Sequence, residues 1–211
     1  MSKTQNTTPD RNTEEAILQA AKRVFTRKGF AAARMEDIAT EAGINRALLH
    51  YYFRSKEKMF ERVFEENMSH FYGSFISILN APAPLDMRIR NLVNAEIDML
   101  LANPDVPLFI LTEISRNPDM IKSKMEKMPV REFMMIFVSS LRTEMQKGTI
   151  RQIEPVHVLM SLMSLCIFPF IGKPMFLTVS GMPPEQFESL MQSRKKVVAD
   201  IILQMLKPEQ A

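Results

Sequence analysis

The stretch MEDIATEAGINRALLHYYFRSKEKMF, residues 35–60, decides the fold of this 211-residue chain. Its apolar residues recur at helical spacing over two short segments, 35–41 and 46 to about 52. Gly43 lies between them, and glycine readily adopts the left-handed backbone that a tight turn needs. Asn45 is a residue type that favours helix N-termini. A short helix, a glycine turn and a second short helix predict a helix-turn-helix motif.

The two predicted helices each have a side that suits burial and a side that suits solvent. The apolar or small residues that we expect to be buried are Ile38, Ala39, Ala42, Ile44 and Leu49. Those expected to face outward from the second helix, or to lie at its rim, are Arg46, Ala47, Leu48, His50 and Tyr51. In a helix-turn-helix the exposed side of the second helix enters the major groove of DNA. Lys56 and Lys58 open the following helix, where ammonium groups can meet phosphate.

Helical patterns continue on both sides of this motif. A helix is expected from Glu14 to Lys28, with Asn12 as its cap and Gly29 as its stop. Ser55 is expected to cap a long helix that ends at the Asn80–Pro84 segment. Further helices are predicted at about 85–102, 105–116, 119–126, 129–147, 155–172 and 184–206.

No segment alternates as a strand does, so the fold class is predicted to be all-α, with nine or ten helices. We expect a flexible N-terminal arm at 1–12 and a three-helix DNA-binding domain at 13–60. The long helix connects that domain, up to about residue 80, to a helical ligand-binding and dimerisation domain at 81–211.

Charge is concentrated in the first part of the chain. Residues 1–60 contain eleven Lys and Arg against seven Asp and Glu, whereas the whole chain has a formal charge of only +3. A basic N-terminal part suggests an anionic partner, although an ordinary solvated surface explains the same count. The polar N-terminus contains no secretory signal, and the apolar run 158–171 is too short to span a membrane. We therefore expect a cytoplasmic protein with no membrane partner.

The sequence contains no arrangement typical of an enzyme. The single Cys166 excludes an intrachain disulfide and lies in an apolar run, where a thiol is unreactive. The three histidines, His50, His70 and His157, are isolated from one another and from cysteine. We predict neither catalytic residues nor a metal site, and no cofactor.

Residues 35–60, together with Ile17–Phe25 and Gly29-Phe30, closely resemble the signature of the tetracycline-repressor (TetR) family. The resemblance covers roughly residues 13–60 and is specific over that span. The rest of the chain is similar to the family only in length, helix content and the junction from Gly148 to Pro155. The resemblance implies a homodimeric, ligand-responsive repressor that binds an operator in double-stranded DNA and has a variable C-terminal domain.

Site residues can be carried over from the family by position. Arg46 and Tyr51 match positions that often touch bases or backbone, and Ala47 matches a small position where the recognition helix approaches DNA. His50 falls where a phosphate-contacting Tyr is common. Lys56 matches a phosphate-contacting Lys.

Three positions depart from the family pattern. Arg34 replaces the usual Thr or Ser cap, Asn45 replaces Ser, and Leu48 replaces a common Thr. Arg34 can still reach phosphate and Asn45 can still cap a helix. Leu48 cannot hydrogen-bond a base edge but can contact a thymine methyl group. All three are retained as predicted DNA-binding residues, and the departures affect which operator is recognised.

Methionine is concentrated in the C-terminal domain, which holds fourteen of the eighteen. Methionine is flexible and polarisable, so a methionine-lined cavity adapts to varied apolar molecules, although ordinary core filling explains any single residue. We predict a pocket for a mostly apolar small molecule lined by Met99, Phe109, Phe133, Met134, Phe137, Met160 and Met163.

The last two long helices have the pattern of a subunit interface. Residues 158–171 are apolar nearly all round, and 187–205 carry an apolar stripe. Paired with a symmetry mate, they predict a four-helix bundle, the alternative being the internal core of one subunit. The predicted interface residues are Leu162, Phe187, Leu190, Met191, Arg194, Val198, Ile201 and Met205.

Together these patterns predict a ligand-responsive repressor that releases a pseudo-palindromic operator when an apolar effector binds. The alternative is a DNA-bound adaptor that recruits a protein partner and binds no small molecule.

Overall fold

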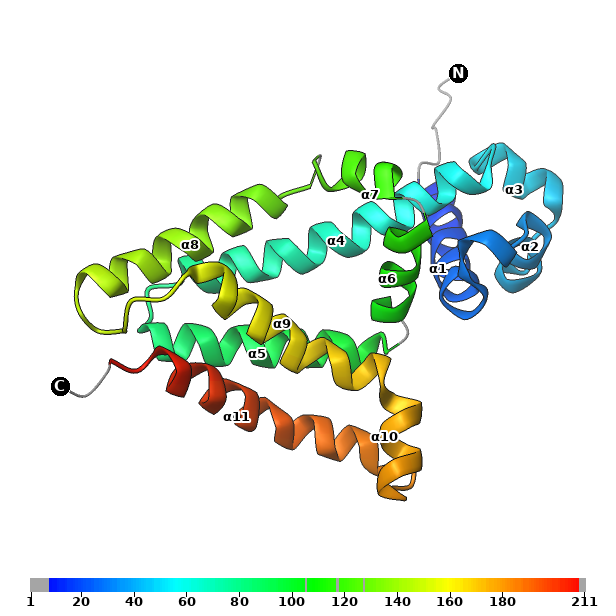
Figure 1. The fold of residues 1–211 in the computed structure, drawn as a ribbon. Coiled ribbons are helices and arrows are strands. Elements are labelled where there is room, and N and C mark those ends of the chain that lie inside the picture. Colours follow the sequence, from blue (N-terminus) through cyan, green and yellow to red (C-terminus); the bar gives the residue numbers. More distant parts are fainter. Residues whose placement is uncertain (1–7, 105, 117, 127, 209–211) are drawn as a thin grey trace. The chain divides into compact units, whose positions relative to one another are not determined.

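The computed structural model describes residues 8–104, 106–116, 118–126 and 128–208. Over these residues the chain forms eleven α-helices and no strand, which confirms the all-α prediction (Figure 1). The helices are α1 Thr8–Ala32, α2 Met35–Ala42, α3 Arg46–Tyr52, α4 Lys56–Asn80, α5 Leu85–Ala102, α6 Val106–Arg116, α7 Pro118–Met125, α8 Val130–Gln146, α9 Pro155–Ile171, α10 Lys173–Ser180 and α11 Gln186–Leu206.

The helices divide between two compact units. The N-terminal unit comprises residues 1–69 and 109–124, and the C-terminal unit comprises 70–108 and 125–211. The division falls inside α4, where the sequence predicted a connecting helix. It differs from the predicted domains in one respect, because most of α6 and nearly all of α7 group with the N-terminal unit.

Three boundaries show how well local signals predict helices. The first helix begins at Thr8, inside the predicted flexible arm, of which residues 1–7 lie outside the described part. Gly29 interrupts it as expected, with a φ of 74°. The sequence analysis missed α10, because it predicted one helix at 155–172 and the next only at 184–206. Pro174 lies in the first turn of α10, where proline leaves no hydrogen bond unmade.

In the N-terminal unit, a small aromatic and aliphatic core holds α2 and α3 against α1. Phe25 and Phe60 meet edge to face, with ring centroids 5.6 Å apart. Ile38 of α2 and Leu49 of α3 are completely buried. Each short helix is thus held by burial of one side, which a helix of seven or eight residues needs because it is not stable alone.

In the C-terminal unit α5 is the central helix. It packs mainly against α11 and also against α9, which crosses it in Figure 1. Its inward residues Ile89, Val93 and Ile97 are completely buried. A second cluster joins the C-terminal part of α4 to α8 through the rings of Tyr72 and Phe133, whose centroids lie 5.6 Å apart.

No single helix among the described residues is both long and apolar enough to cross a membrane. Only α9 and α10 taken together reach that length and composition, and they are bent by 69° at the break between them.

The most apolar helix, α9, contains a proline, and a side chain of α11 replaces the hydrogen bond that this proline removes. Pro169 has no N–H, so the carbonyl of Leu165, four residues earlier, lacks its usual helical donor. Arg194 of α11 donates from Nε to that carbonyl at 3.0 Å. The bond links α11 to α9 one turn before Pro169. Arg194, predicted to lie in the dimer interface, therefore has a partner within its own chain.

We expect Arg194→Met to lower the free energy of unfolding by about 1–3 kcal/mol, because a partly buried carbonyl loses a charged donor. Pro169→Ala restores an N–H to α9, so Arg194→Met should cost less in that background. Urea denaturation of wild type, both single variants and the double variant measures this coupling. Equal costs of Arg194→Met in both backgrounds would show that the bond does not compensate for the proline.

Candidate nucleic-acid interface and the core of the C-terminal unit

The turn between α2 and α3 has the predicted geometry. Gly43 adopts a left-handed conformation with a φ of 68°, and the Ile44 N–H donates to the Ala39 carbonyl at 3.0 Å. Asn45 caps α3, with its Oδ1 accepting from the Leu48 N–H at 2.8 Å. The turn and the cap together fix where α3 begins, and so fix the direction of its exposed side.

Ion pairs attach α2 to α1 on the outside of the N-terminal unit. Glu41 pairs with Arg23 at 2.8 Å and with Arg27 at 3.2 Å, and these guanidinium groups lower the pKa of its carboxyl. Asp37 accepts from Lys28 at 2.9 Å and from the Arg34 backbone N–H at 3.0 Å, which lowers its pKa as well. These solvent-exposed pairs orient α2 and contribute little stability each.

The predicted DNA-contacting residues of α3 lie together on its solvent-exposed side. Leu49 is the buried residue of this helix, whereas Tyr51 is 74% exposed. Arg46 donates from Nε to Nε2 of His50 at 3.4 Å, so the two side chains lie next to each other. The exposed members of the predicted set are Arg34, Asn45, Arg46, Ala47, Leu48, His50 and Tyr51. Their contact with DNA stays a prediction.

Lys56 does not belong to this exposed set. Its Nζ donates to the backbone carbonyls of Phe30 at 2.8 Å and Ala33 at 3.0 Å, and it lies over the Phe30 ring at 4.5 Å. It therefore ties the start of α4 to the end of α1. The sequence, which matched Lys56 to a phosphate-contacting position, gave no sign of this second role.

The predicted pocket residues do not form a single lining. Phe133 and Phe137 are buried in the aromatic cluster with Tyr72, whereas Met160 is 59% exposed on α9. The side chain of Phe109 lies outside the described part of the structure. The half-buried members are Met99, Met134 and Met163.

The core of the C-terminal unit contains a carboxyl group that the sequence analysis did not identify. Glu96 of α5 is completely buried, no N–H or O–H group among the described residues donates to its carboxyl oxygens, and the Cys166 thiol faces them. Burial raises its pKa to about 8, and the facing thiol of Cys166 offsets part of that rise. The buried Tyr72 hydroxyl and Cys166 thiol have raised pKa values for the same reason, in part because Glu96 is near. The sequence feature that could have identified this buried carboxyl is a glutamate at a core position of α5.

The described part of the C-terminal unit includes a larger and a smaller surface hollow, and the predicted pocket residues line neither of these. One, of about 510 Å³, lies between α9, α10 and α11 and has a mostly apolar lining that includes Phe168, Phe176, Leu190 and Val197. The other, of about 1210 Å³, opens beside the ends of α8 and α11.

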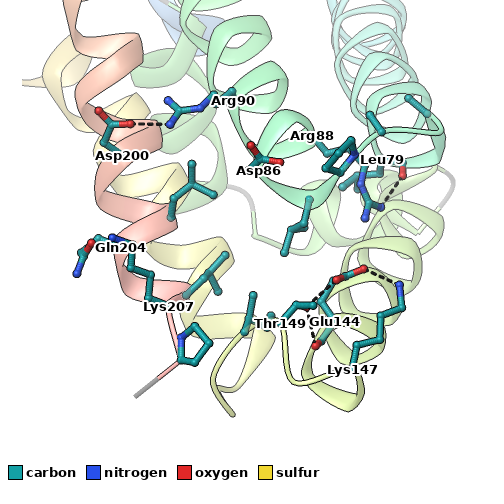
Figure 2. Close-up of a pocket in the computed structure, with 18 of the residues that line it drawn as sticks. Leu79, Asp86, Arg88, Arg90, Glu144, Lys147, Thr149, Asp200, Gln204 and Lys207 are labelled. Carbon is teal, nitrogen blue, oxygen red and sulfur yellow. Dashed lines mark hydrogen bonds and ion pairs between the residues drawn. The ribbon is translucent and has the colours of Figure 1, made fainter. Parts of the chain in front are cut away.

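Figure 2 shows that charged side chains surround the larger hollow and pair with one another. Arg90 meets Asp200 at 2.8 Å, and Glu144 meets Lys147 at 3.0 Å. Arg88 donates to the Leu79 carbonyl at 3.1 Å. Because most of these charges are already neutralised, the larger hollow offers little to attract a charged ligand.

The predicted interface residues separate into two groups. Leu162, Phe187, Met191 and Val198 are buried within their own chain, so they do not face a partner. Leu190 and Ile201 are exposed, and Met205 is half-buried. The exposed apolar stripe of α11 keeps Leu190 and Ile201 from the predicted stripe but runs through Val197 in place of Val198. The large exposed apolar residues of α9 and α11, called the α9–α11 face from here on, are Val156, Met160, Phe168, Leu190, Val197 and Ile201.

Comparison with known proteins gives consistent matches. A family model described as bacterial regulatory proteins of the tetR family matches residues 17–63. The HTH-type transcriptional repressor NicS of Pseudomonas putida is 31% identical over 163 residues, which cover 74% of each chain. The probable HTH-type transcriptional regulator YttP of Bacillus subtilis is 23% identical over 181 residues, which cover 83% of this chain and 85% of the relative.

Solved structures match over almost the whole length. A transcriptional regulator from Streptomyces coelicolor gives a TM-score of 0.69 at 21% identity, covering 92% of this chain and 98% of the other. A fatty acid metabolism regulator from Clostridium perfringens gives 0.68 at 18% identity, covering 92% and 100%. At this identity the likeness shows a shared fold.

Lys56→Met should destabilise the N-terminal unit by about 1–3 kcal/mol, because the Phe30 and Ala33 carbonyls lose a charged donor. If the ammonium also reaches phosphate, binding to all DNA sequences weakens alike and the salt dependence falls by about one unit of log–log slope. Thermal unfolding and salt titrations measure the two effects.

The control is Lys58→Met, because Lys58 is exposed and its ion pair with Glu61 spans 3.6 Å. This substitution should leave stability nearly unchanged. If Lys56→Met is as stable as wild type, Lys56 does not stabilise the N-terminal unit. If Lys56→Met loses affinity for operator DNA alone, Lys56 does not act by contacting phosphate.

Glu96 should make the stability of the C-terminal unit depend on pH. The unfolded chain ionises this carboxyl near its ordinary pKa of 4.5, whereas the folded chain keeps the proton up to about 8. Below pH 4.5 the carboxyl is protonated in the folded and in the unfolded chain, so it does not lower the free energy of unfolding. As the pH rises from 4.5 to 8, the unfolded chain ionises while the folded chain does not, so the free energy of unfolding falls. At about 1.36 kcal/mol for each pH unit, the loss is on the order of 5 kcal/mol.

Glu96→Gln removes the titration while keeping the size of the side chain. We expect wild type to lose stability relative to Glu96→Gln between pH 5 and pH 8, as followed by urea denaturation. Glu188→Gln, at an exposed position of α11, is the control and should follow wild type at every pH. Parallel curves for wild type and Glu96→Gln would show that Glu96 is not held protonated.

Proposed function

This chain belongs to the TetR family of bacterial transcription regulators, and we propose that it is a ligand-responsive repressor that binds a pseudo-palindromic operator as a homodimer. The observation that carries the DNA-binding part is the exposed side of α3. Arg46, His50 and Tyr51 project from a helix whose start is fixed by Gly43 and Asn45. A seven-residue helix presented in this way suits insertion into the major groove.

The small number of base-reading side chains supports a dimer. Ala47 and Leu48 can make only apolar contacts with base edges, which leaves Arg46, His50 and Tyr51 as the polar side chains of α3 that can reach them. One such helix reads too few bases for genomic specificity, whereas two held by a dimer read twice as many. A two-fold dimer places its recognition helices one helical turn of DNA apart, about 34–36 Å, or a multiple of it.

The α9–α11 face gives a second reason to propose a dimer. Its six residues are large and apolar, and contiguous exposed apolar surface commonly marks an interaction site. The 510 Å³ hollow adjoins this face, since Phe168, Leu190 and Val197 line it. A second copy that covers the face also fills this hollow, and two α9–α11 pairs then form the four-helix bundle.

Ligand-responsive repression is supported by relatives and by the core of the C-terminal unit. The Pseudomonas putida relative is named a transcriptional repressor. A completely buried carboxyl that faces the weakly donating thiol of Cys166, one helical turn from the half-buried Met99, suits a site that takes a ligand better than it suits a core optimised for stability. The adaptor alternative gives no reason to keep Glu96 in the core, so we favour the ligand-responsive repressor.

Arg46→Ala should change the preferred DNA sequence and weaken operator binding by about 1–3 kcal/mol, because a guanidinium that reads guanine loses both of its hydrogen bonds. Binding-site selection on wild type and variant tests this. Arg131→Ala, an exposed arginine of α8, is the control with the same change of charge. An unchanged preferred sequence for Arg46→Ala would leave Arg46 with a role in holding the DNA backbone only.

Val197→Asp combined with Ile201→Asp should give folded monomers that no longer bind operator tightly, because each carboxylate would be desolvated in the interface. Both positions are about half exposed in the single chain, so the variant should fold. Light scattering and a gel shift measure assembly and binding. Gln192→Asp, exposed on the same helix, is the control. A monomeric variant with wild-type operator affinity would refute the dimer.

A further inference from the structure

We propose that the hollow of about 510 Å³ between α9, α10 and α11 binds an apolar molecule with one carboxylate, and that this ligand competes with the second copy for the α9–α11 face. The site is separate from the buried carboxyl of Glu96. The inference goes beyond the proposed function and rests on its dimer. The hollow has mostly apolar walls and one charged side chain, and these two features define the chemistry of its occupant.

The bend between α9 and α10 builds the hollow. The two helices are bent by 69° at Gly172, so α10 adds a third wall to those of α9 and α11 (Figure 1). Gly172 allows this close approach, because a Cβ there would lie 3.1 Å from the ring of Phe176. The Phe176 ring in turn meets Phe168 edge to face, with centroids 5.8 Å apart. Both rings line the hollow, so packing within the chain forms its shape before a ligand arrives.

The size and lining of the hollow suit a small molecule with an aromatic body. Small-molecule sites have volumes of about 300–1,000 Å³ and mostly apolar walls, and this hollow has both properties. Each of its three helices contributes an aromatic ring: Phe168 from α9, Phe176 from α10 and Phe187 from α11. An aromatic ring of the ligand can meet these rings edge to face.

Arg194 supplies the charged group of the hollow. Its Nε donates to the carbonyl of Leu165, and both residues line the hollow. No hydrogen bond or ion pair between described residues uses Nη1 or Nη2, and neither atom is buried, so solvent reaches both. The Nε bond already holds the guanidinium in place. Its remaining N–H groups form a planar fork that matches a carboxylate.

The electrostatic surroundings favour an anion over a cation. Among the described residues that line the hollow, Arg194 is the charged one and Asp and Glu are absent. The ammonium of Lys173 adds positive charge nearby, since it lies 4.7 Å from the centroid of the Phe187 ring. In the larger hollow, by contrast, charges of opposite sign pair with one another. A carboxylate in the smaller hollow therefore gains charge-assisted hydrogen bonds that an alcohol or an amine does not.

The position of the hollow connects its occupant with the dimer. Leu190 and Val197 belong to the α9–α11 face and also line the hollow. In the proposed dimer the second copy fills the hollow, so the ligand and the second copy exclude each other. By linkage, the ligand weakens the dimer by the factor by which the dimer weakens ligand binding. Because tight operator binding needs two recognition helices, the ligand also lowers operator affinity.

Three probes with one aromatic body test the head group: 4-phenylbutyrate, 4-phenylbutan-1-ol and 4-phenylbutylamine. Calorimetry on the full chain at neutral pH gives each affinity. We expect 4-phenylbutyrate to bind wild type about tenfold more tightly than the alcohol or the amine, which is the effect of a hydrogen bond between charged groups.

The role of Arg194 is tested in the Pro169→Ala background, where α9 regains the N–H that satisfies the Leu165 carbonyl. Adding Arg194→Met to Pro169→Ala should weaken 4-phenylbutyrate binding about tenfold and leave the affinity for the alcohol unchanged. Arg131→Met, which removes the same charge from an exposed position of α8, should bind all three probes as wild type does. Urea denaturation checks folding. If the double variant does not fold, Arg194→Gln replaces it, because glutamine keeps an N–H donor without the charge.

Sedimentation velocity and a gel shift, each over a series of 4-phenylbutyrate concentrations, measure the competition. Dimer fraction and operator affinity should both fall in wild type, and the double variant should need about tenfold more ligand for the same effect.

Equal or tighter binding of the alcohol or the amine overturns the carboxylate site. Unchanged 4-phenylbutyrate affinity in the Arg194 variants overturns it as well, and so does failure to bind wild type at millimolar concentration. Binding that leaves the dimer intact overturns the competition. If wild type is monomeric without any probe, the proposed dimer fails, and the competition with it. If wild type is a dimer that binds operator and 4-phenylbutyrate does not bind, the proposed function stands and the site in the hollow fails.

Discussion

The orientation of the exposed side of α3 depends on the burial of Leu49. A seven-residue helix has no stability of its own, because too few hydrogen bonds offset the cost of starting it. Burial of Leu49, together with Ile38 on α2, places both short helices on the core formed with Phe25 and Phe60. Only then do the Gly43 turn and the Asn45 cap fix which side of α3 faces outward. The ion pairs of Glu41 and Asp37 adjust this arrangement without creating it.

The same dependence explains why the N-terminal unit could be predicted from sequence. Its decisive signals are local: Gly43 and Asn45 act within a few residues of their own positions, and Leu49 lies on the face that helical spacing predicts. Lys56 was the exception. Its partners, the carbonyls of Phe30 and Ala33, are more than twenty residues away, and no local pattern indicates such a tie.

In the C-terminal unit the predictions that missed depended on distant contacts. The apolar stripe of α11 is broad enough to suit two orientations, so the sequence could not decide whether Val197 or Val198 faces its own core. Packing against α5 decided it, burying Val198 and leaving Val197 half exposed. The position of Arg194 could not be predicted, because its acceptor is a backbone carbonyl of another helix. That carbonyl, of Leu165, is available because Pro169 has no N–H to donate to it. The stripe predicted that α11 is amphipathic, and tertiary packing chose its inward side.

If the protein is ligand-responsive as proposed, Glu96 can connect the stability of the C-terminal unit with that response. A ligand can shift the protein between DNA-binding and non-binding arrangements only by the difference in its affinity for the two. A core that is fully satisfied without ligand offers little such difference. A core that holds a buried carboxyl offers one, because a ligand that hydrogen-bonds to this carboxyl stabilises only the arrangement in which it can reach Glu96. By linkage, operator DNA must then weaken effector binding by the same factor as the effector weakens operator binding. Replacing Glu96 should therefore reduce both effects together while leaving the exposed side of α3 and its intrinsic DNA affinity unchanged.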